Sequence, residues 1–172
     1  ETFNGRTLLV TPAGHGFDDI TWALPLPLTR LGDVIALARR ITFRVMVESP
    51  EAADALEAAA KSAGIRMHVW LEVDCGYHRS GVDPALPASA ALARRLAESP
   101  QLTFDGLLTH AGHSYGAPDA AARALVAKQE RQNLLRVLRN AQRLLAPVEV
   151  LNPFAPELTF ATGRTRSRRD HE

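Results

Sequence analysis

The chain has 172 residues, of which 46% are hydrophobic, and a net charge of +1. This composition supports one sizeable folded core and excludes an intrinsically disordered chain. The near-neutral charge gives no basis for binding nucleic acid or an anionic membrane, and no apolar run approaches the about 20 residues of a membrane span. A single cysteine forms no internal disulfide, so we expect a reducing, cytoplasmic location.

Strand-like and helix-like segments alternate along the chain. Short apolar, β-branched runs predict strands over residues 19–27, 42–49, 67–74, 104–110 and 147–152. Helical spacing of apolar residues predicts helices over residues 32–40, 49–64, 86–100 and 118–145. Strands that are separated by helices predict a parallel sheet with right-handed crossovers. The strands contain few polar positions, which predicts that both faces of the sheet are covered.

This alternation is typical of an open doubly wound sheet or of a (β/α)8 barrel. A complete TIM-type barrel takes about 250 residues, so we expect an α/β fold with a partial parallel barrel of about five to six of the eight βα units. Residues 1–15 are expected to form an atypical N-terminal segment, residues 16–152 the partial barrel domain, and residues 153–172 a disordered tail. Unpaired sheet edges also predict self-association into a homo-oligomer or an aggregate.

In either architecture, functional side chains gather at the C-terminal ends of the parallel strands. Polar and titratable side chains concentrate after the third and fourth predicted strands: Asp74, Cys75, His78, Arg79, His110, His113 and Tyr115. A guanidinium such as that of Arg79 stays charged and binds carboxylate or phenolate oxygens through a rigid set of donors. His110 directly follows a strand and is expected to point into the same site.

Two chemical alternatives remain open for these residues. Asp74, His110 and His113 are metal-ligand types, which would suit a metal-dependent lyase or hydrolase. Cys75 could act as a nucleophile with His78 or His110 as its base. The neighbouring charge of Asp74 disfavours a thiolate, so a packing role for Cys75 is the preferred interpretation.

The segments VWLEVDCGYHRSGVDP and FDGLLTHAGHSYGA resemble the N-terminal barrel domain of the alanine-racemase-like, fold type III pyridoxal-phosphate enzymes. They look most like the branch that holds D-threonine aldolase and D-serine dehydratase-like proteins, and GFDDITWALPL and RVMVESPEAADAL are also similar to that branch. The resemblance covers residues 16–151. It implies pyridoxal phosphate as cofactor and a D-amino acid as substrate, with aldol cleavage, dehydration or racemisation as the reaction of the parent enzyme.

The resemblance also implies roles for single residues. Arg79 would hydrogen-bond the phenolic oxygen of the cofactor ring, and His110 would stack on the face of that ring. His113 and Tyr115 would lie beside the cofactor and the substrate, which makes them the candidate catalytic residues. Asp74 is expected to orient neighbouring loop groups rather than to take part in the chemistry.

The sequence departs from the family pattern at the covalent anchor of the cofactor. The family binds the cofactor through a lysine on the first barrel strand, whereas Lys61 and Lys128 both fall in predicted helices. VLNPFAPELTFATG stands where the family has a Ser/Gly/Thr-rich phosphate cradle, and the family's metal site lies in a second domain outside this chain. We therefore expect a truncated or degenerate barrel domain that is inactive alone. The alternatives are a metal-dependent enzyme and a non-catalytic remnant that binds a small molecule or a partner chain.

Overall fold

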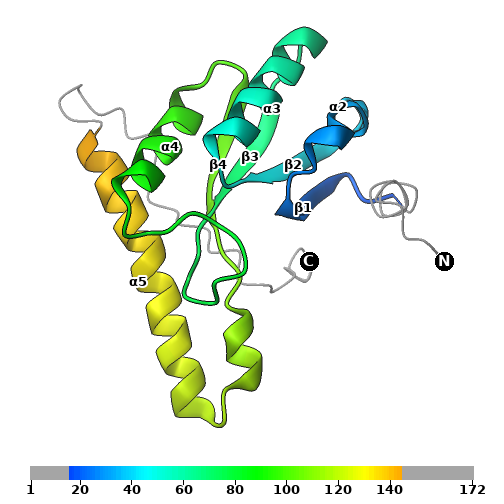
Figure 1. Cartoon of the computed structure of the whole chain (residues 1–172). Helices are drawn as coiled ribbons and strands as arrows, with labels where there is room; N and C mark the ends of the chain where they lie inside the picture. Colours follow the sequence, from blue (N-terminus) through cyan, green and yellow to red (C-terminus); the bar gives the residue numbers. More distant parts are fainter. Residues whose placement is uncertain (1–15, 145–172) are drawn as a thin grey trace, which may run out of the picture.

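The computed structural model describes residues 16–144, which form one parallel sheet with helices between the strands (Figure 1). The strands are β1 (Asp19–Pro25), β2 (Thr42–Val47), β3 (Met67–Glu72) and β4 (Leu102–Leu108), and they lie side by side in chain order. All three neighbouring pairs are parallel. A doubly wound sheet reverses its strand order, so consecutive order identifies part of a barrel. The predicted α/β partial barrel is therefore confirmed. The predicted strand at 147–152 and the segments 1–15 and 153–172 lie outside the described residues.

The helical elements follow the strands in regular alternation: η1 (Leu28–Arg30), α2 (Leu31–Ala38), α3 (Pro50–Ala63), α4 (Pro87–Glu98), η2 (Gly112–Gly116) and α5 (Ala120–Leu144). The predicted signals act at both ends of α3. The Ser49 hydroxyl accepts a hydrogen bond from the Ala52 backbone N–H at 3.2 Å, and Gly64 ends the helix in a left-handed conformation with φ 66°. None of the described helices has an apolar stretch long enough to span a bilayer.

One face of the sheet forms the hydrophobic core together with the helices. Phe43, Val45 and Val47 alternate along β2, and each is at most 1% exposed. They belong to the same buried cluster as Leu56 of α3 and Leu96 of α4. Burial of each of these large side chains stabilises the fold by about 1.5–3 kcal/mol. This packing fixes the strands and, with them, the positions of the loops at their C-terminal ends.

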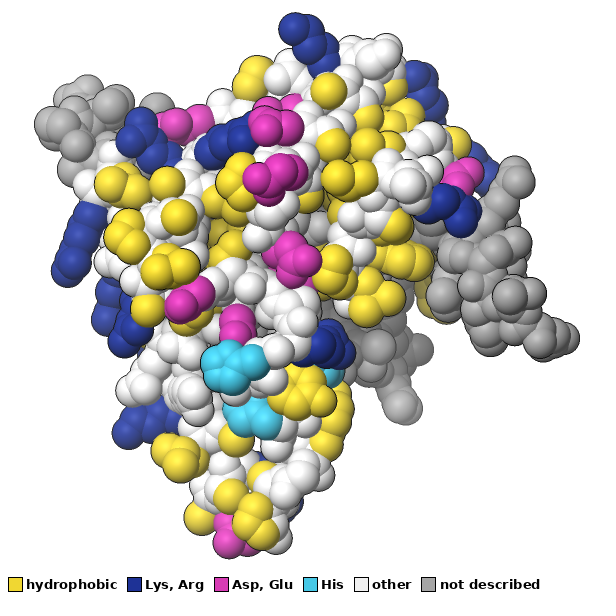
Figure 2. All heavy atoms as spheres, viewed as in Figure 1, with side chains coloured by type: hydrophobic (Ala, Val, Ile, Leu, Met, Phe, Trp, Pro, Cys, Tyr) yellow, Lys and Arg dark blue, Asp and Glu magenta, His cyan; other side chains and the backbone are white. Residues whose placement is uncertain are grey.

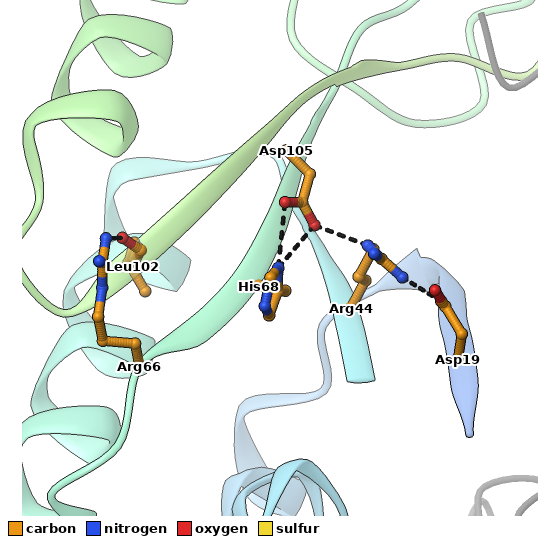
Figure 3. A network of polar contacts seen from close by, with 6 residues as sticks. All are labelled: Asp19, Arg44, Arg66, His68, Leu102 and Asp105. Carbon is orange, nitrogen blue, oxygen red and sulfur yellow. Dashed lines mark hydrogen bonds and ion pairs between the residues drawn. The ribbon is translucent and has the colours of Figure 1, made fainter. Parts of the chain in front are cut away.

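The opposite face carries a polar network (Figure 3), followed further along the strands by the apolar side chains of Met46 and Trp70. The Arg44 Nε atom donates to Asp105 at 2.7 Å, and a second guanidinium nitrogen of Arg44 pairs with Asp19. His68 Nδ1 lies 3.0 Å from the same Asp105 carboxylate. The expectation of few polar positions is therefore wrong for the part of this face that the network occupies, whereas Met46 on the same face is 1% exposed. These polar residues alternate with core residues along the strands, and they satisfy one another.

Candidate functional site

The loop that follows β3 closes back on its own strand. The Val82 backbone N–H donates to the Glu72 carbonyl at 2.9 Å, and the Asp74 N–H donates to the Val82 carbonyl at 3.0 Å. Gly81 makes this return possible because its φ is +98° and an added Cβ would lie 2.6 Å from the Asp74 nitrogen. We call residues 74–81 the Arg79 loop, since they present that side chain at the C-terminal edge of the sheet.

Asp74 organises the first half of the Arg79 loop, as predicted. Its Oδ1 atom accepts backbone N–H groups from Gly76 at 2.8 Å and from His78 at 3.0 Å. Its Oδ2 atom lies 2.7 Å from the His78 ring Nδ1 atom. Partial burial alone would raise the pKa of Asp74, but these hydrogen bonds and the His78 ring together lower that pKa below its ordinary value. Asp74 is therefore an ionised acceptor at neutral pH.

Two further carboxylates hold the second half of the Arg79 loop. The Ser80 hydroxyl donates to Glu72 Oε1 at 2.6 Å, and the Gly81 N–H donates to Glu48 Oε2 at 2.8 Å. The Glu72 side chain is buried, and its Oε2 atom has no hydrogen-bond partner among the described residues. Burial raises the pKa of Glu72, and the Ser80 hydrogen bond and the Arg79 charge oppose that rise only in part. Sequence reasoning gave no role to Glu48 or Glu72.

A cluster of four rings lies beside this loop, and we call Tyr77, His110, His113 and Tyr115 the ring cluster. His110 meets Tyr77 and Tyr115 edge to face, each with ring centres 5.8 Å apart. Tyr77 stacks on His113 at 5.9 Å with 20° between the ring planes. Gly112 permits this approach, because an added Cβ would lie 2.5 Å from a Tyr77 ring carbon. Tyr77 was not predicted, although its place between Asp74 and Arg79 was a usable signal.

Arg79 and His110 lie in the loops that follow the adjacent strands β3 and β4, close enough for the charge of Arg79 to act on His110. Burial, and then the positive charge of Arg79, lower the pKa of His110 below its ordinary value. The His110 imidazole is therefore neutral at pH 7. Cys75 is buried, and its thiol donates to the His110 carbonyl at 3.3 Å. That contact connects the Arg79 loop to the loop after β4 and agrees with a packing role for Cys75.

His113 and Tyr115, the two candidate catalytic residues, lie on η2 and differ in their surroundings. Both ring nitrogens of His113 are buried without a hydrogen-bond partner in the described part of the chain. Burial raises the pKa of Glu130 on α5, and the charge of His113 opposes that rise. Tyr115 is 81% exposed, and His110 is its one aromatic neighbour within residues 16–144. Neither side chain is fixed by a hydrogen bond in this range.

On the face of the molecule that Figure 2 shows, histidine side chains lie in the lower half, and several acidic side chains lie above them. Within residues 16–144, no group of three His, Cys, Asp or Glu side chains is arranged to hold a metal ion. The metal alternative built on Asp74, His110 and His113 therefore has no geometric support there.

Lys61 lies in the last turn of α3 and Lys128 lies within α5, so both lysines are on helices, as predicted.

A sequence model described as "Alanine racemase, N-terminal domain" matches residues 21–153. The chain belongs to this family. It is 30% identical to D-threo-3-hydroxyaspartate dehydratase from Delftia sp. (strain HT23) over 151 residues, which are 87% of this chain and 40% of the relative. It is 31% identical to D-serine dehydratase from Dictyostelium discoideum over 124 residues, which are 64% of this chain and 31% of that protein.

Solved structures agree with the family assignment at the level of the fold. The Delftia dehydratase superposes with a TM-score of 0.73 and 29% identity, over 82% of this chain and 38% of that chain. D-threonine aldolase from Filomicrobium marinum superposes with a TM-score of 0.72 and 22% identity, over 85% of this chain and 39% of that chain. The chain thus spans less than half of the length of each of these relatives. The predicted resemblance to the dehydratase and aldolase branch is confirmed.

Proposed function

We propose that this chain is a ring-recognition domain for pyridoxal phosphate, derived from enzymes that act on D-amino acids, and that it is inactive alone. The carrying observation is that Arg79 and His110 follow the adjacent strands β3 and β4, in loops joined by the hydrogen bond from Cys75 to the His110 carbonyl. The Arg79 guanidinium has no hydrogen bond or ion pair with another residue in the range 16–144, so its donors are free for a ligand. Named relatives with this domain are dehydratases of D-amino acids and a D-threonine aldolase.

The residues present suit recognition of the cofactor ring. A guanidinium donates charge-assisted hydrogen bonds to an anionic oxygen such as a phenolate. A neutral, flat imidazole can lie on an aromatic ring without a charge penalty. Bound pyridoxal phosphate supplies an electron sink for a substrate carbanion. In this arrangement Arg79 orients the ring oxygen, while His110 covers one face of the ring and keeps water from it.

The residues present do not suit covalent attachment of the cofactor. Lys61 and Lys128 are the only lysines of the chain, and both are exposed on helices. Neither lies on a strand, where the family resemblance places the lysine that binds the cofactor. Binding without covalent attachment follows, and the chain alone should not catalyse aldol cleavage, dehydration or racemisation. His113 and Tyr115 remain the candidates for contact with the amino acid.

A titration of the purified chain with pyridoxal phosphate, read by absorbance and by protein fluorescence, tests this proposal. We expect saturable binding that leaves no adduct after borohydride reduction. Loss of a hydrogen bond to a charged group costs about 1.5–3 kcal/mol, so Arg79→Ala should weaken binding about 10- to 100-fold. His110→Ala should weaken it as well. Arg123→Ala, which removes an exposed arginine of α5, is the matched control and should bind normally.

Two results would overturn the proposed mode of binding, and a third would overturn the proposed inactivity. The first is equal affinity of the Arg79→Ala variant and the wild-type chain, because the free guanidinium would then have no part in binding. The second is a stoichiometric covalent adduct after reduction that is lost in Lys61→Arg or Lys128→Arg. That adduct would show that a helical lysine reaches the cofactor. Measurable D-threonine cleavage or D-serine deamination above a His110→Ala control would refute the inactivity of the chain.

A further inference from the structure

The residues on both sides of Arg79 are held by carboxylates that come from outside or from the start of the loop. His78, immediately before Arg79, is bound through its N–H and its ring by Asp74. Ser80, immediately after it, is bound by Glu72 at 2.6 Å. Gly81, the next residue, is bound by Glu48 at 2.8 Å. The backbone that carries Arg79 is therefore fixed on both sides, while its guanidinium has no partner within the described residues.

A glutamate at position 72 is unfavourable for the stability of the fold. Its side chain is only 1% exposed, and one carboxylate oxygen has no partner in the described range. Burial of a carboxylate with an unsatisfied oxygen is unfavourable, and an apolar side chain would pack there without that cost. Glu72 therefore contributes something other than core stability. Within residues 16–144 its side chain has one hydrogen bond, the one from Ser80, so that contribution goes to the Arg79 loop.

Glu48 complements Glu72 from the neighbouring strand. It directly follows β2, and its side chain reaches across to the Gly81 N–H. That contact lies where the chain needs glycine, because an added Cβ would approach the Val73 carbonyl carbon to 2.7 Å. Glu48 and Glu72 thus hold consecutive residues of one loop from two adjacent strands. This is the arrangement that reduces the conformational freedom of a binding side chain before its ligand arrives.

We propose that Glu48 and Glu72 are positioning residues that aim the Arg79 guanidinium at the anionic oxygen of an aromatic ligand. The identity of that ligand rests on the proposed function. The rigidity of the Arg79 loop does not, because it can be measured in the free protein. Both carboxylates act through Arg79 and touch neither ligand nor reacting atoms.

The test combines loop protection with ligand affinity. Backbone amide exchange by NMR reports the Gly81 N–H, and the titration with pyridoxal phosphate reports the affinity. Glu48→Ala should accelerate Gly81 exchange at least tenfold and weaken binding severalfold. Glu48→Gln keeps an acceptor oxygen, so it should retain most of the protection of the Gly81 N–H and most of the affinity. Glu51→Gln, an exposed acid of α3, is the matched control and should change neither.

Glu72 is tested in the same way, with a milder variant as support. Glu72→Ala should weaken binding, and Glu72→Gln should restore it because the amide oxygen still accepts from Ser80. Ser80→Ala removes the same hydrogen bond from a partly exposed position, so it tests the idea even if Glu72→Ala does not fold. In an Arg79→Ala background, Glu48→Ala and Ser80→Ala should cause no further loss of affinity, because their effects pass through Arg79.

The outcomes separate this proposal from the proposed function. An affinity loss that persists undiminished in the Arg79→Ala background would overturn it, since the carboxylates would then act by another route. Unchanged Gly81 exchange in Glu48→Ala would overturn it as well. If no variant, the wild-type chain included, binds pyridoxal phosphate, the proposed function fails. The fixed loop is then judged by exchange alone: faster exchange in Glu48→Ala supports it, and unchanged exchange overturns it.

Discussion

Gly81→Ala is the substitution to which the site should respond most strongly, because it combines backbone strain with a steric conflict. Gly81 has φ +98°, a conformation that L side chains rarely adopt. An added Cβ would also lie 2.6 Å from the Asp74 nitrogen and 2.7 Å from the Val73 carbonyl carbon. Both are backbone atoms that cannot rotate away. The loop must therefore move, or β3 must shift in the sheet.

The loss in free energy of unfolding that we expect for Gly81→Ala has two parts, and a matched control separates them. Gly64→Ala carries the backbone part alone, since Gly64 has φ +66° and no atom near an added Cβ, so it should cost about 1–2 kcal/mol. Gly81→Ala adds the steric conflict, typically about 1–3 kcal/mol for an overpacked site. The sum is about 2–5 kcal/mol. With a urea slope of about 2 kcal/mol per M, the midpoint should fall by about 1–2.5 M.

Urea unfolding followed by the fluorescence of Trp22 and Trp70 measures both variants on the same scale. Gly81→Ala should be the less stable of the two, and it should also lose the hydrogen bond from Gly81 to Glu48. If the two variants are equally destabilised, the steric part is absent. The close return of the Arg79 loop onto β3 would then be wrong, and with it the way in which Arg79 is presented.

Three further predictions test the fold and the charge state of the site. Ser49→Ala removes the cap of α3 and should lower the free energy of unfolding by about 1 kcal/mol in urea melts, whereas Ser62→Ala within the same helix should leave it nearly unchanged. Leu56→Ala leaves a cavity in a fully buried position and should cost about 2–5 kcal/mol; a loss below about 1 kcal/mol would contradict the packing of α3. Because the pKa of His110 is lower in the folded state than the ordinary 6.5, its contribution is complete above that pH and is lost as the pH falls below it. Melts of His110→Gln between pH 5 and 7 should therefore be flatter than those of the wild type, and parallel profiles would show that His110 titrates normally.

The elements of the fold could be predicted from the sequence because local signals agreed with the final packing. Ser49 and Gly64 marked the ends of α3, and their geometry is as expected. The apolar alternation of β2 marked the core face. The second face was misjudged because Arg44, His68 and Asp105 are far apart in sequence. Only the register of β2, β3 and β4 brings them into one network.

The sequence indicates where the candidate site lies, but it does not indicate which residues hold the Arg79 loop in place. Strand-end position was enough to select Arg79 and His110, since parallel strands present their C-terminal ends at one edge. Glu72 was overlooked because it reads as a polar residue at the end of an apolar run. Its role depends on Ser80 folding back over the strand, which follows from the conformation of Gly81. No spacing rule in the sequence reports a contact of that kind.

The contrast between Arg44 and Arg79 explains why we propose the second as the arginine that binds the ligand. Arg44 lies in the first half of β2 and Arg79 in the loop after β3, and both lie near carboxylates. Arg44 is bound by Asp105 and Asp19, so its charge is already compensated and its donors are in use. Arg79 influences Glu72 and His110 through its charge but forms no ion pair within residues 16–144. An anion would have to displace two carboxylates to reach Arg44, whereas it would meet Arg79 with its donors free and its backbone already fixed.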